Sequence, residues 1–258
     1  MHILVTNDDG VHAPGLLALA QAMRTLGKVT VLAPDHNWSV SGHVKTLHRP
    51  LWVKETTLAD GTAALATDGA PSDCVALAVL GVINEPIDFV VSGINPFPNL
   101  GNDLTYSGTV MAAMEGVIWG ISSIAVSING DETSLKHLNY QTPAAAAVQA
   151  VKLVLANKLP DETLLNINVP NKSPEEIKGF RITRQGKRVY QDLLIEHHDP
   201  RGRPYYWIGG DAPVGVTEPD TDVGALEEGY VSINPIHCDL TAHHLINTLK
   251  KWDWPPLS

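Results

Sequence analysis

The chain has 258 residues, of which 44% are hydrophobic and 18% charged, and its formal net charge is −10. A hydrophobic fraction of this size supplies a large core and excludes wholesale disorder, and the length fits one large domain or one domain with an appendage. The acidic balance argues against binding long nucleic acid, whereas a small phosphorylated substrate stays possible because a divalent cation can supply positive charge locally.

Short apolar runs alternate with helical patterns through the first two thirds of the chain. Strands are predicted at 3–5, 29–33, 87–91, 124–128 and 164–169, and helices at 14–26, 71–83, 107–119 and 142–157. A loosely alternating segment at 51–66, interrupted by Asp60-Gly61, predicts a hairpin. Strand–helix–strand units join parallel neighbours, so the predicted fold class is α/β, with a Rossmann-like, doubly wound and mostly parallel sheet.

The pattern changes after Pro170. A strand is predicted at 180–189, a protruding hairpin at 196–210 with a Tyr205-Tyr206-Trp207 cluster, a last strand at 230–234 and a short helix at 244–252. Exposed aromatic side chains on a hairpin are typical of a protein interface.

Location and thiol chemistry follow from what the chain contains. Cys74 and Cys238 make no metal motif and are predicted to be buried free thiols. The N-terminus lacks the features of an export signal, and the apolar stretch 117–128 is too short and too polar to span a bilayer. We therefore expect a cytoplasmic protein without a membrane partner.

The first strand leads into two adjacent carboxylates, Asp8 and Asp9, followed by Gly10. Adjacent carboxylates repel each other unless a cation lies between them or one of them is protonated. Their hard oxygens suit Mg²⁺, Mn²⁺ or Ca²⁺. The alternative is a solvent-exposed Asp-Gly turn without a ligand.

Two further strand ends are polar. Ser39 and Ser41 follow the second strand, and Asn95 and Asn99 follow the strand at 87–91. Ligands of open parallel sheets bind at the carboxyl ends of the strands, so these side chains are predicted to join the two carboxylates at one oxygen-rich site.

An anion site is predicted beside the cation. Ser107-Gly108-Thr109 begins a helix, whose free N–H groups and dipole attract a phosphate. Ordinary N-capping is the alternative explanation.

Other catalytic motifs are missing. The sequence contains no P-loop, dinucleotide fingerprint, zincin motif or nucleophile elbow. The pairs His197-His198 and His243-His244 are interpreted as solvated, and Asp68 as a turn or cap residue or a functional one.

These motifs together resemble the SurE family (survival protein E), metal-dependent phosphatases that act on nucleoside 5′-monophosphates. The matching stretches are LVTNDDG at 4–10, Ala33-Pro34 with Ser39 and Gly42-His43, TDGAPSDCV at 67–75, VVSGIN at 90–95, NLGND at 99–103, YSGT at 106–109, LNINVP at 165–170, and 229–232 with Leu240-Thr241. They cover nearly the whole chain in the expected order.

The resemblance implies a set of site residues. One divalent ion per subunit, Mg²⁺ or Mn²⁺, is expected on Asp8, Asp9, Ser39 and Asn95, with Asp8 and Asp9 also catalytic. The phosphate or substrate is expected to contact Asn7, Gly42, His43, Asn99, Ser107, Gly108 and Thr109.

The resemblance also implies assembly. A single SurE-like domain over 1–258 is expected to form a homodimer or homotetramer with swapped segments. The contacts would come from the hairpin at 184–210 and a C-terminal tail at 235–258.

The chain departs from the family pattern at Pro96-Phe97-Pro98, where the family usually has a glycine two residues after the ligand asparagine. Phenylalanine does not reach positive φ as cheaply as glycine, and two prolines stiffen the loop. This difference bears on the shape of the loop and on substrate preference more than on the metal.

The predicted activity is hydrolysis of nucleoside 5′-monophosphates by a metal-dependent phosphomonoesterase. Asp8 or Asp9 would anchor the ion, and Asp9 would orient or activate the nucleophile. Attack by water and attack by an Asp carboxylate both stay open, as does the preferred base. The alternative from another functional class is a non-catalytic nucleotide-binding or regulatory module.

Overall fold

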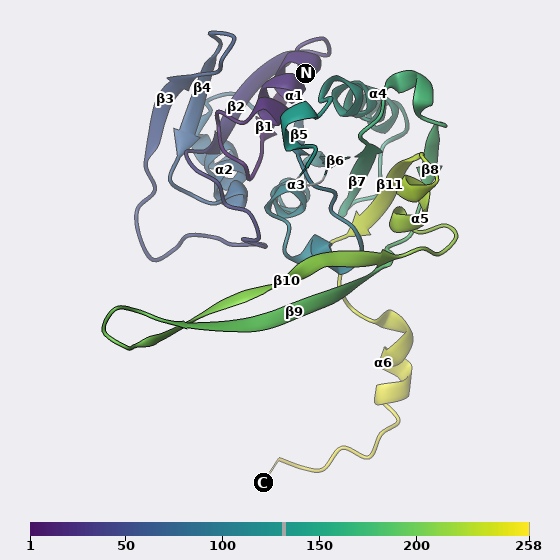
Figure 1. Ribbon diagram of the computed structural model, residues 1–258. Coiled ribbons are helices and arrows are strands. Elements are labelled where there is room, and N and C mark those ends of the chain that lie inside the picture. The colour runs from purple at the N-terminus through teal and green to yellow at the C-terminus, as the bar shows by residue number, and fades with distance from the viewer. Residues whose placement is uncertain (131–132, 258) are drawn as a thin grey trace.

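A computed structural model describes residues 1–130 and 133–257. The described chain forms a nine-stranded sheet in the order β3-β4-β2-β1-β5-β6-β7-β11-β8, with helices on both faces (Figure 1). Its strands are β1 His2–Thr6, β2 Lys28–Pro34, β3 Val53–Thr57, β4 Ala63–Thr67, β5 Phe89–Asn95, β6 Ser122–Asn129, β7 Thr163–Pro170, β8 Phe180–Ile182 and β11 Val231–His237. Its α-helices are α1 Pro14–Met23, α2 Pro71–Leu77, α3 Gly108–Ile118, α4 Gln141–Asn157, α5 Asp222–Glu227 and α6 His243–Leu249.

The centre of the sheet is parallel. Strand β1 pairs in parallel with both β2 and β5, and the parallel pairing continues through β4 on one side and through β6 and β7 on the other. Strands β3 and β11 pair antiparallel with β4 and β7. Because the connections run in opposite directions from β1, the topological switch point lies between β1 and β5. The predicted doubly wound α/β fold is confirmed.

The central strands are largely apolar because both faces of the sheet are covered. Ile3 and Val5 pack into the core that contains α1 and α4, whereas Leu4 packs with residues of α2 and α3. Successive side chains on a strand point to opposite faces, so one short run serves both layers.

Several predicted boundaries shift. Helix α1 ends at Met23 rather than at residue 26, and the predicted helix at 71–83 becomes α2 followed by one wider turn, Ala78–Val82, with Gly81 at φ +119°. The predicted strand at 180–189 splits into β8 and β9 (Lys187–His198). Helix α5 was not predicted, because six residues are too few to show helical periodicity.

A long hairpin of β9 and β10 (Pro204–Val216) crosses below the sheet and extends past the body of the domain (Figure 1). It reaches six residues beyond the predicted end at 210. Helix α6 and the chain after it point away from the sheet in the same view. Ser258, the last residue of the predicted tail, lies outside the described residues.

The cysteine prediction is correct for one residue. Cys74 is buried in the core and Cys238 is only partly buried, because it follows the last strand of the sheet, and both are free thiols. Within residues 1–130 and 133–257, no helix has the length and apolar character needed to cross a membrane.

Candidate active site

A cavity of about 590 Å³ opens at the carboxyl ends of β1 and β5, beside the topological switch point. Five of the predicted site residues line it, namely Asp8, Ser39, Asn95, Asn99 and Ser107. Its size falls within the range of small-molecule sites, and ligands of doubly wound sheets bind at this edge. The structure therefore brings together residues that lie up to 99 positions apart in the sequence.

Asp8 lies against the first turn of helix α3. The Thr109 hydroxyl donates a hydrogen bond to Asp8 Oδ1, and both residues are buried. A Cβ added to Gly108 would lie 2.8 Å from Asp8 Cβ and 2.9 Å from Ser41 Oγ, so only glycine fits between them. Burial raises the pKa of Asp8, and hydrogen bonds from the Thr109 side chain and from the backbone of Thr109 and Gly108 oppose that rise. The helix N-terminus is thus directed at this carboxylate.

Asp9 does not line the cavity. Its Oδ2 is buried without a hydrogen-bond partner in the described chain, and burial together with the charge of Asp8 raises its pKa to about 7. The pKa of nearby Tyr140 is raised to about 12 by burial and by the charge of Asp9. An unpartnered buried carboxylate oxygen needs a proton or a cation.

Asn95 ends β5 and is oriented by the loop that departs from the family pattern. Its Nδ2 donates to the carbonyl of Phe97 over 2.6 Å, which leaves Oδ1 available as a ligand. Phe97 is not among the residues with positive φ, so the loop accommodates it without the conformation that favours glycine. Phe97 and Pro98 instead form part of the cavity wall.

Asn99 is fixed by a buried network of amides from β7. Its N–H donates to Asn168 Oδ1 over 2.8 Å, and its carbonyl accepts from the side chains of Asn166 and Asn168 at 2.9 and 3.0 Å. Its own Nδ2 donates to Ser127 Oγ over 2.8 Å. The backbone N–H and one side-chain N–H of Asn99 are therefore used in positioning, and its Oδ1 remains for a ligand.

Ser39 and Ser41 lie on the loop that follows β2. Hydrogen bonds join this loop to Asp8, after β1, and to Tyr106, before α3. The Trp38 N–H donates to the Asp8 carbonyl over 2.7 Å, and the Gly42 N–H donates to the Tyr106 carbonyl over 3.0 Å. Ser41 Oγ is buried next to Gly108 and has no partner in the described chain. This hydroxyl is free to bind an anion at the start of α3.

Four predicted contact residues have hydrogen-bond partners within the chain. The Asn7 amide is buried and bonds to both backbone groups of Gly10, so it closes the turn that carries the two carboxylates. His43 Nε2 lies 2.9 Å from Glu115 Oε2 and outside the cavity lining. Gly42 donates to the Tyr106 carbonyl, and the Thr109 hydroxyl donates to Asp8.

Sequence reasoning missed Glu115, a buried carboxylate on α3. It accepts from His43, Lys45 and Trp119, each at 2.9 Å. Burial alone would raise the pKa of Glu115, but these hydrogen bonds outweigh burial and lower it to about 2. An acidic residue in an otherwise apolar helix was the only indication of this role in the sequence. The amides Asn166 and Asn168 in an apolar strand were a comparable indication.

The residues around Asp8 and Asp9 fit a hard divalent cation. Buried Asp8 shares the cavity lining with Ser39 and Asn95, and the next residue, Asp9, has a buried oxygen without a hydrogen-bond partner in the described chain. No group of three His, Cys, Asp or Glu side chains suited to a metal occurs in residues 1–130 and 133–257. A cation here would therefore rely on neutral oxygens and water for the rest of its ligands, as Mg²⁺ commonly does.

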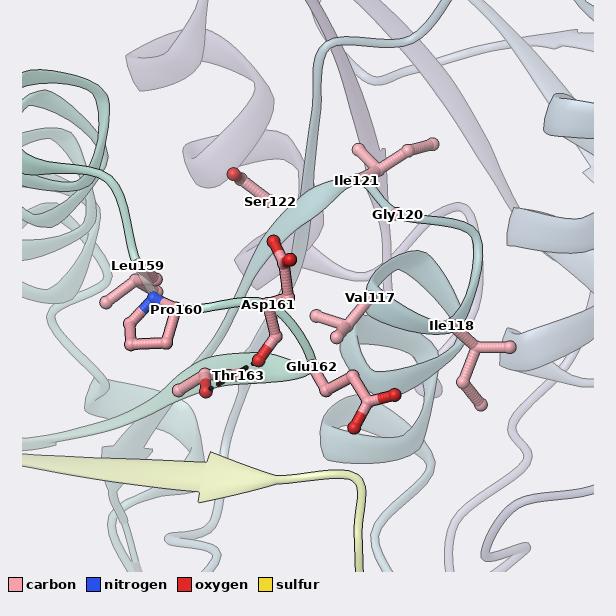
Figure 2. A pocket seen from close by; sticks show the side chains of 10 residues that line it. All are labelled: Val117, Ile118, Gly120, Ile121, Ser122, Leu159, Pro160, Asp161, Glu162 and Thr163. Carbon is pink, nitrogen blue, oxygen red and sulfur yellow. Dashed lines mark hydrogen bonds between the residues drawn. The ribbon is translucent and has the colours of Figure 1, made fainter.

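A second cavity, of about 260 Å³, lies at the opposite edge of the sheet, where β6 and β7 begin. Figure 2 shows Asp161 and Glu162 there among apolar side chains such as Val117, Ile121 and Leu159. The Thr163 hydroxyl donates to the Asp161 backbone carbonyl. This cavity is distant from the carboxyl ends of the strands and contains none of the predicted site residues.

Fold and cavity together define a class, namely doubly wound α/β proteins with a cavity lined by polar side chains at the switch point. The sequence model of the family described as "Survival protein SurE" matches residues 3–192. A protein of Chloroflexus aggregans named 5′-nucleotidase SurE is 48% identical over 98% of this chain and 100% of its own length. A protein of Herpetosiphon aurantiacus with the same name is 50% identical over 98% of this chain and 99% of its own length.

A solved structure agrees with these relatives. The crystal structure of the SurE protein from Aquifex aeolicus superposes with a TM-score of 0.81 at 41% identity, covering 97% of this chain and 98% of that one. The chain belongs to the SurE family.

Proposed function

We propose that this chain is a 5′-nucleotidase that hydrolyses nucleoside 5′-monophosphates to nucleoside and phosphate. The names of its full-length relatives support this activity. The observation that carries the proposal is the position of the buried Asp8 carboxylate, which lines the cavity and is hydrogen-bonded to the N-terminal turn of α3.

The proposed site needs one divalent ion per subunit, Mg²⁺ or Mn²⁺, held by Asp8, Asp9, Ser39 and Asn95. When bound, the ion would neutralise the carboxylates and supply Lewis-acid activation of the phosphoryl group. Thr109 and the backbone of Gly108 hold Asp8 in place, and Asn95 presents its amide oxygen because Phe97 takes its Nδ2.

The phosphate would bind between that ion and the start of α3. Ser41 Oγ, Ser107 and Asn99 Oδ1 provide polar contacts there, and Gly108 allows close approach to the backbone. Asp9 would orient or activate the nucleophile, because its unpartnered oxygen can accept a proton.

The proposal is tested by measuring phosphate release from a panel of nucleoside monophosphates and from p-nitrophenyl phosphate. Assays with Mg²⁺, with Mn²⁺ and with EDTA would compare the unmodified protein with Asp8→Asn. We expect turnover that requires a divalent ion and falls at least a hundredfold in Asp8→Asn, because the variant loses a charged ligand. Nucleotide binding without turnover under any metal would replace the enzyme with a non-catalytic nucleotide-binding module.

We further propose that one domain spanning residues 1–258 assembles into a homodimer or homotetramer. The hairpin of β9 and β10 supports this, because Leu194, Trp207 and Ile208 on it are 71%, 62% and 83% exposed. Apolar side chains displayed in this way are typical of a surface covered by a second copy. The tail after β11 would contribute to the same assembly.

A further inference from the structure

The hairpin contributes a cation to the candidate active site. Among the side chains that line the 590 Å³ cavity, Asp8 and Asp103 carry negative charge and only Arg188, at the start of β9, carries positive charge. All residues of this lining are described in the structure. A nucleoside monophosphate would bring a phosphate of up to two negative charges into this cavity. Arg188 is the one positively charged side chain of the lining that could pair with it.

Arg188 is held at the cavity by contacts from three sides. Its Nη2 donates to the carbonyl of Pro213 on β10 over 2.9 Å, and its Nε lies 3.4 Å from Asp103 Oδ2. Its stem passes over Gly101, where an added Cβ would lie 3.2 Å from Arg188 Cγ. The side chain is 14% exposed, so few rotamers remain open to it.

Asp103 is itself fixed by a second residue of the hairpin. The Tyr190 hydroxyl donates to Asp103 Oδ1 over 2.6 Å, and burial together with this hydrogen bond raises the pKa of Tyr190, which keeps it a donor. Asp103 follows Asn99 by four residues and lies on the short turn Gly101–Thr105 that leads to the start of α3. The ion pair therefore connects the hairpin to the segment that carries the phosphate contacts.

The root of the hairpin is attached to the same turn. Asp222 is fully buried and accepts from the N–H groups of Gly101 and Gly186 at 2.9 and 2.8 Å. Gln185 Nε2 donates to the Gly101 carbonyl over 2.9 Å. The position of Arg188 relative to Asn99 is thus set by hydrogen bonds on both sides of the turn.

Resting on the proposed function, we infer that Arg188 is a substrate-binding residue whose guanidinium binds the phosphate of the nucleotide. Nε lies beside Asp103 and Nη2 donates to the Pro213 carbonyl, whereas Nη1 makes no hydrogen bond with the described chain and keeps two N–H donors for a ligand. Guanidinium groups bind phosphate through paired N–H donors. Asp103 and Tyr190 act as positioning residues that hold this donor set towards the cavity.

The test compares Arg188→Met, Arg188→Lys and the unmodified protein in two measurements. Binding of inorganic phosphate is measured by calorimetry with Mg²⁺ present, which requires no turnover. In parallel, kcat and KM are measured for adenosine 5′-monophosphate and for p-nitrophenyl phosphate, which shares only the phosphate. Arg184→Met is the matched control, because it removes the same charge from a side chain that is 59% exposed and paired with Glu218 outside the cavity.

We expect Arg188→Met to weaken phosphate binding by about tenfold to a hundredfold, as loss of a charge-assisted hydrogen-bond pair predicts. Arg188→Lys should recover part of the loss and Arg184→Met should bind like the unmodified protein. The fall in kcat/KM should be equal for the two substrates, and melting temperatures should confirm folding. Arg188→Gln, which keeps a neutral hydrogen-bond donor, replaces the Met variant if that one is unstable.

Two results would overturn the inference. The first is unchanged phosphate binding in both Arg188→Met and Arg188→Gln, and the second is a fall in kcat/KM for the nucleotide but not for p-nitrophenyl phosphate. The second would place Arg188 against the nucleoside. Failure of the proposed function looks different, since the unmodified protein would then bind phosphate through Arg188 but turn over neither substrate.

Discussion

At the scale of single residues, Asp8 and Asp9 show how one dipeptide takes two environments. Asp8 accepts a hydrogen bond from the Thr109 hydroxyl and lines the cavity, whereas Asp9 lies outside the lining and has one oxygen without a partner in the described chain. Both pKa values are raised, chiefly because burial disfavours the charged forms. The metal-free pair is consequently a source of instability that a bound cation would remove.

A pH dependence of stability follows for the metal-free protein. The pKa of Asp9 is about 7 in the folded state against an ordinary value of 3.8, so the folded state binds the proton more tightly than the unfolded state. Stability is therefore greatest at low pH as far as this group is concerned, and it is lost as the pH rises from about 4 to about 7. Chemical denaturation in EDTA at several pH values measures this slope.

Asp9→Asn provides the comparison. The variant lacks the titrating group, so in EDTA it should gain stability over the unmodified protein, and the gain should be larger at pH 8 than at pH 5. Excess Mg²⁺ should reduce the difference, because the cation compensates the unmodified carboxylate. A gain independent of pH would show that Asp9 is not the group responsible.

At the scale of elements, the loop between β2 and β3 is held by carboxylates from three places. Glu115 on α3 binds His43 and Lys45, and Asp73 on α2 accepts from the N–H and hydroxyl of Thr46 at 2.8 and 2.7 Å. Asp68 binds Arg49 and the Trp52 N–H. Asp68 is thus a turn residue that anchors this loop. Because the loop carries Ser39 and Ser41, its anchors position two residues of the site.

Glu115→Gln tests the anchoring of this loop. Loss of the charge weakens the bonds to Lys45 and His43, and we expect a loss of about 1–2 kcal/mol in the free energy of unfolding, with weaker Mg²⁺ binding through Ser39. Glu175→Gln on an exposed turn removes the same charge as a control. Denaturation and calorimetric Mg²⁺ titration measure both effects, and a stability loss with unchanged Mg²⁺ affinity would separate the loop from the metal site.

At the scale of the whole molecule, the hairpin reaches in two directions. Its root supplies Arg188 and Tyr190 to the cavity, and its outer part displays apolar residues away from the domain (Figure 1). If the outer part is covered by a second copy, assembly would also steady the wall of the cavity near Arg188.

Trp207→Lys is the variant that addresses assembly. A lysine at this exposed apolar position would place a charge in the proposed contact. We expect the dissociation constant of the oligomer to rise at least tenfold. Sedimentation equilibrium over a range of concentrations measures the shift. Lys187→Met, at the hairpin root, serves as a control outside the apolar surface. A monomeric unmodified protein would refute the assembly proposal directly.

The sequence by itself determined the α/β class and indicated which polar residues follow the strand ends. Apolar runs, polar residues after strands and a glycine at the start of a helix are local patterns. Asp8, Asp9, Asn95 and Gly108 could therefore be proposed as site residues from the sequence. Only the tertiary structure decided which polar groups bind the chain itself. Asn7 and His43 turned out to be bound to Gly10 and Glu115, and Arg188 reached the cavity through a hairpin that crosses below the sheet. Such pairings depend on how distant segments meet in space, and no short stretch of sequence encodes them.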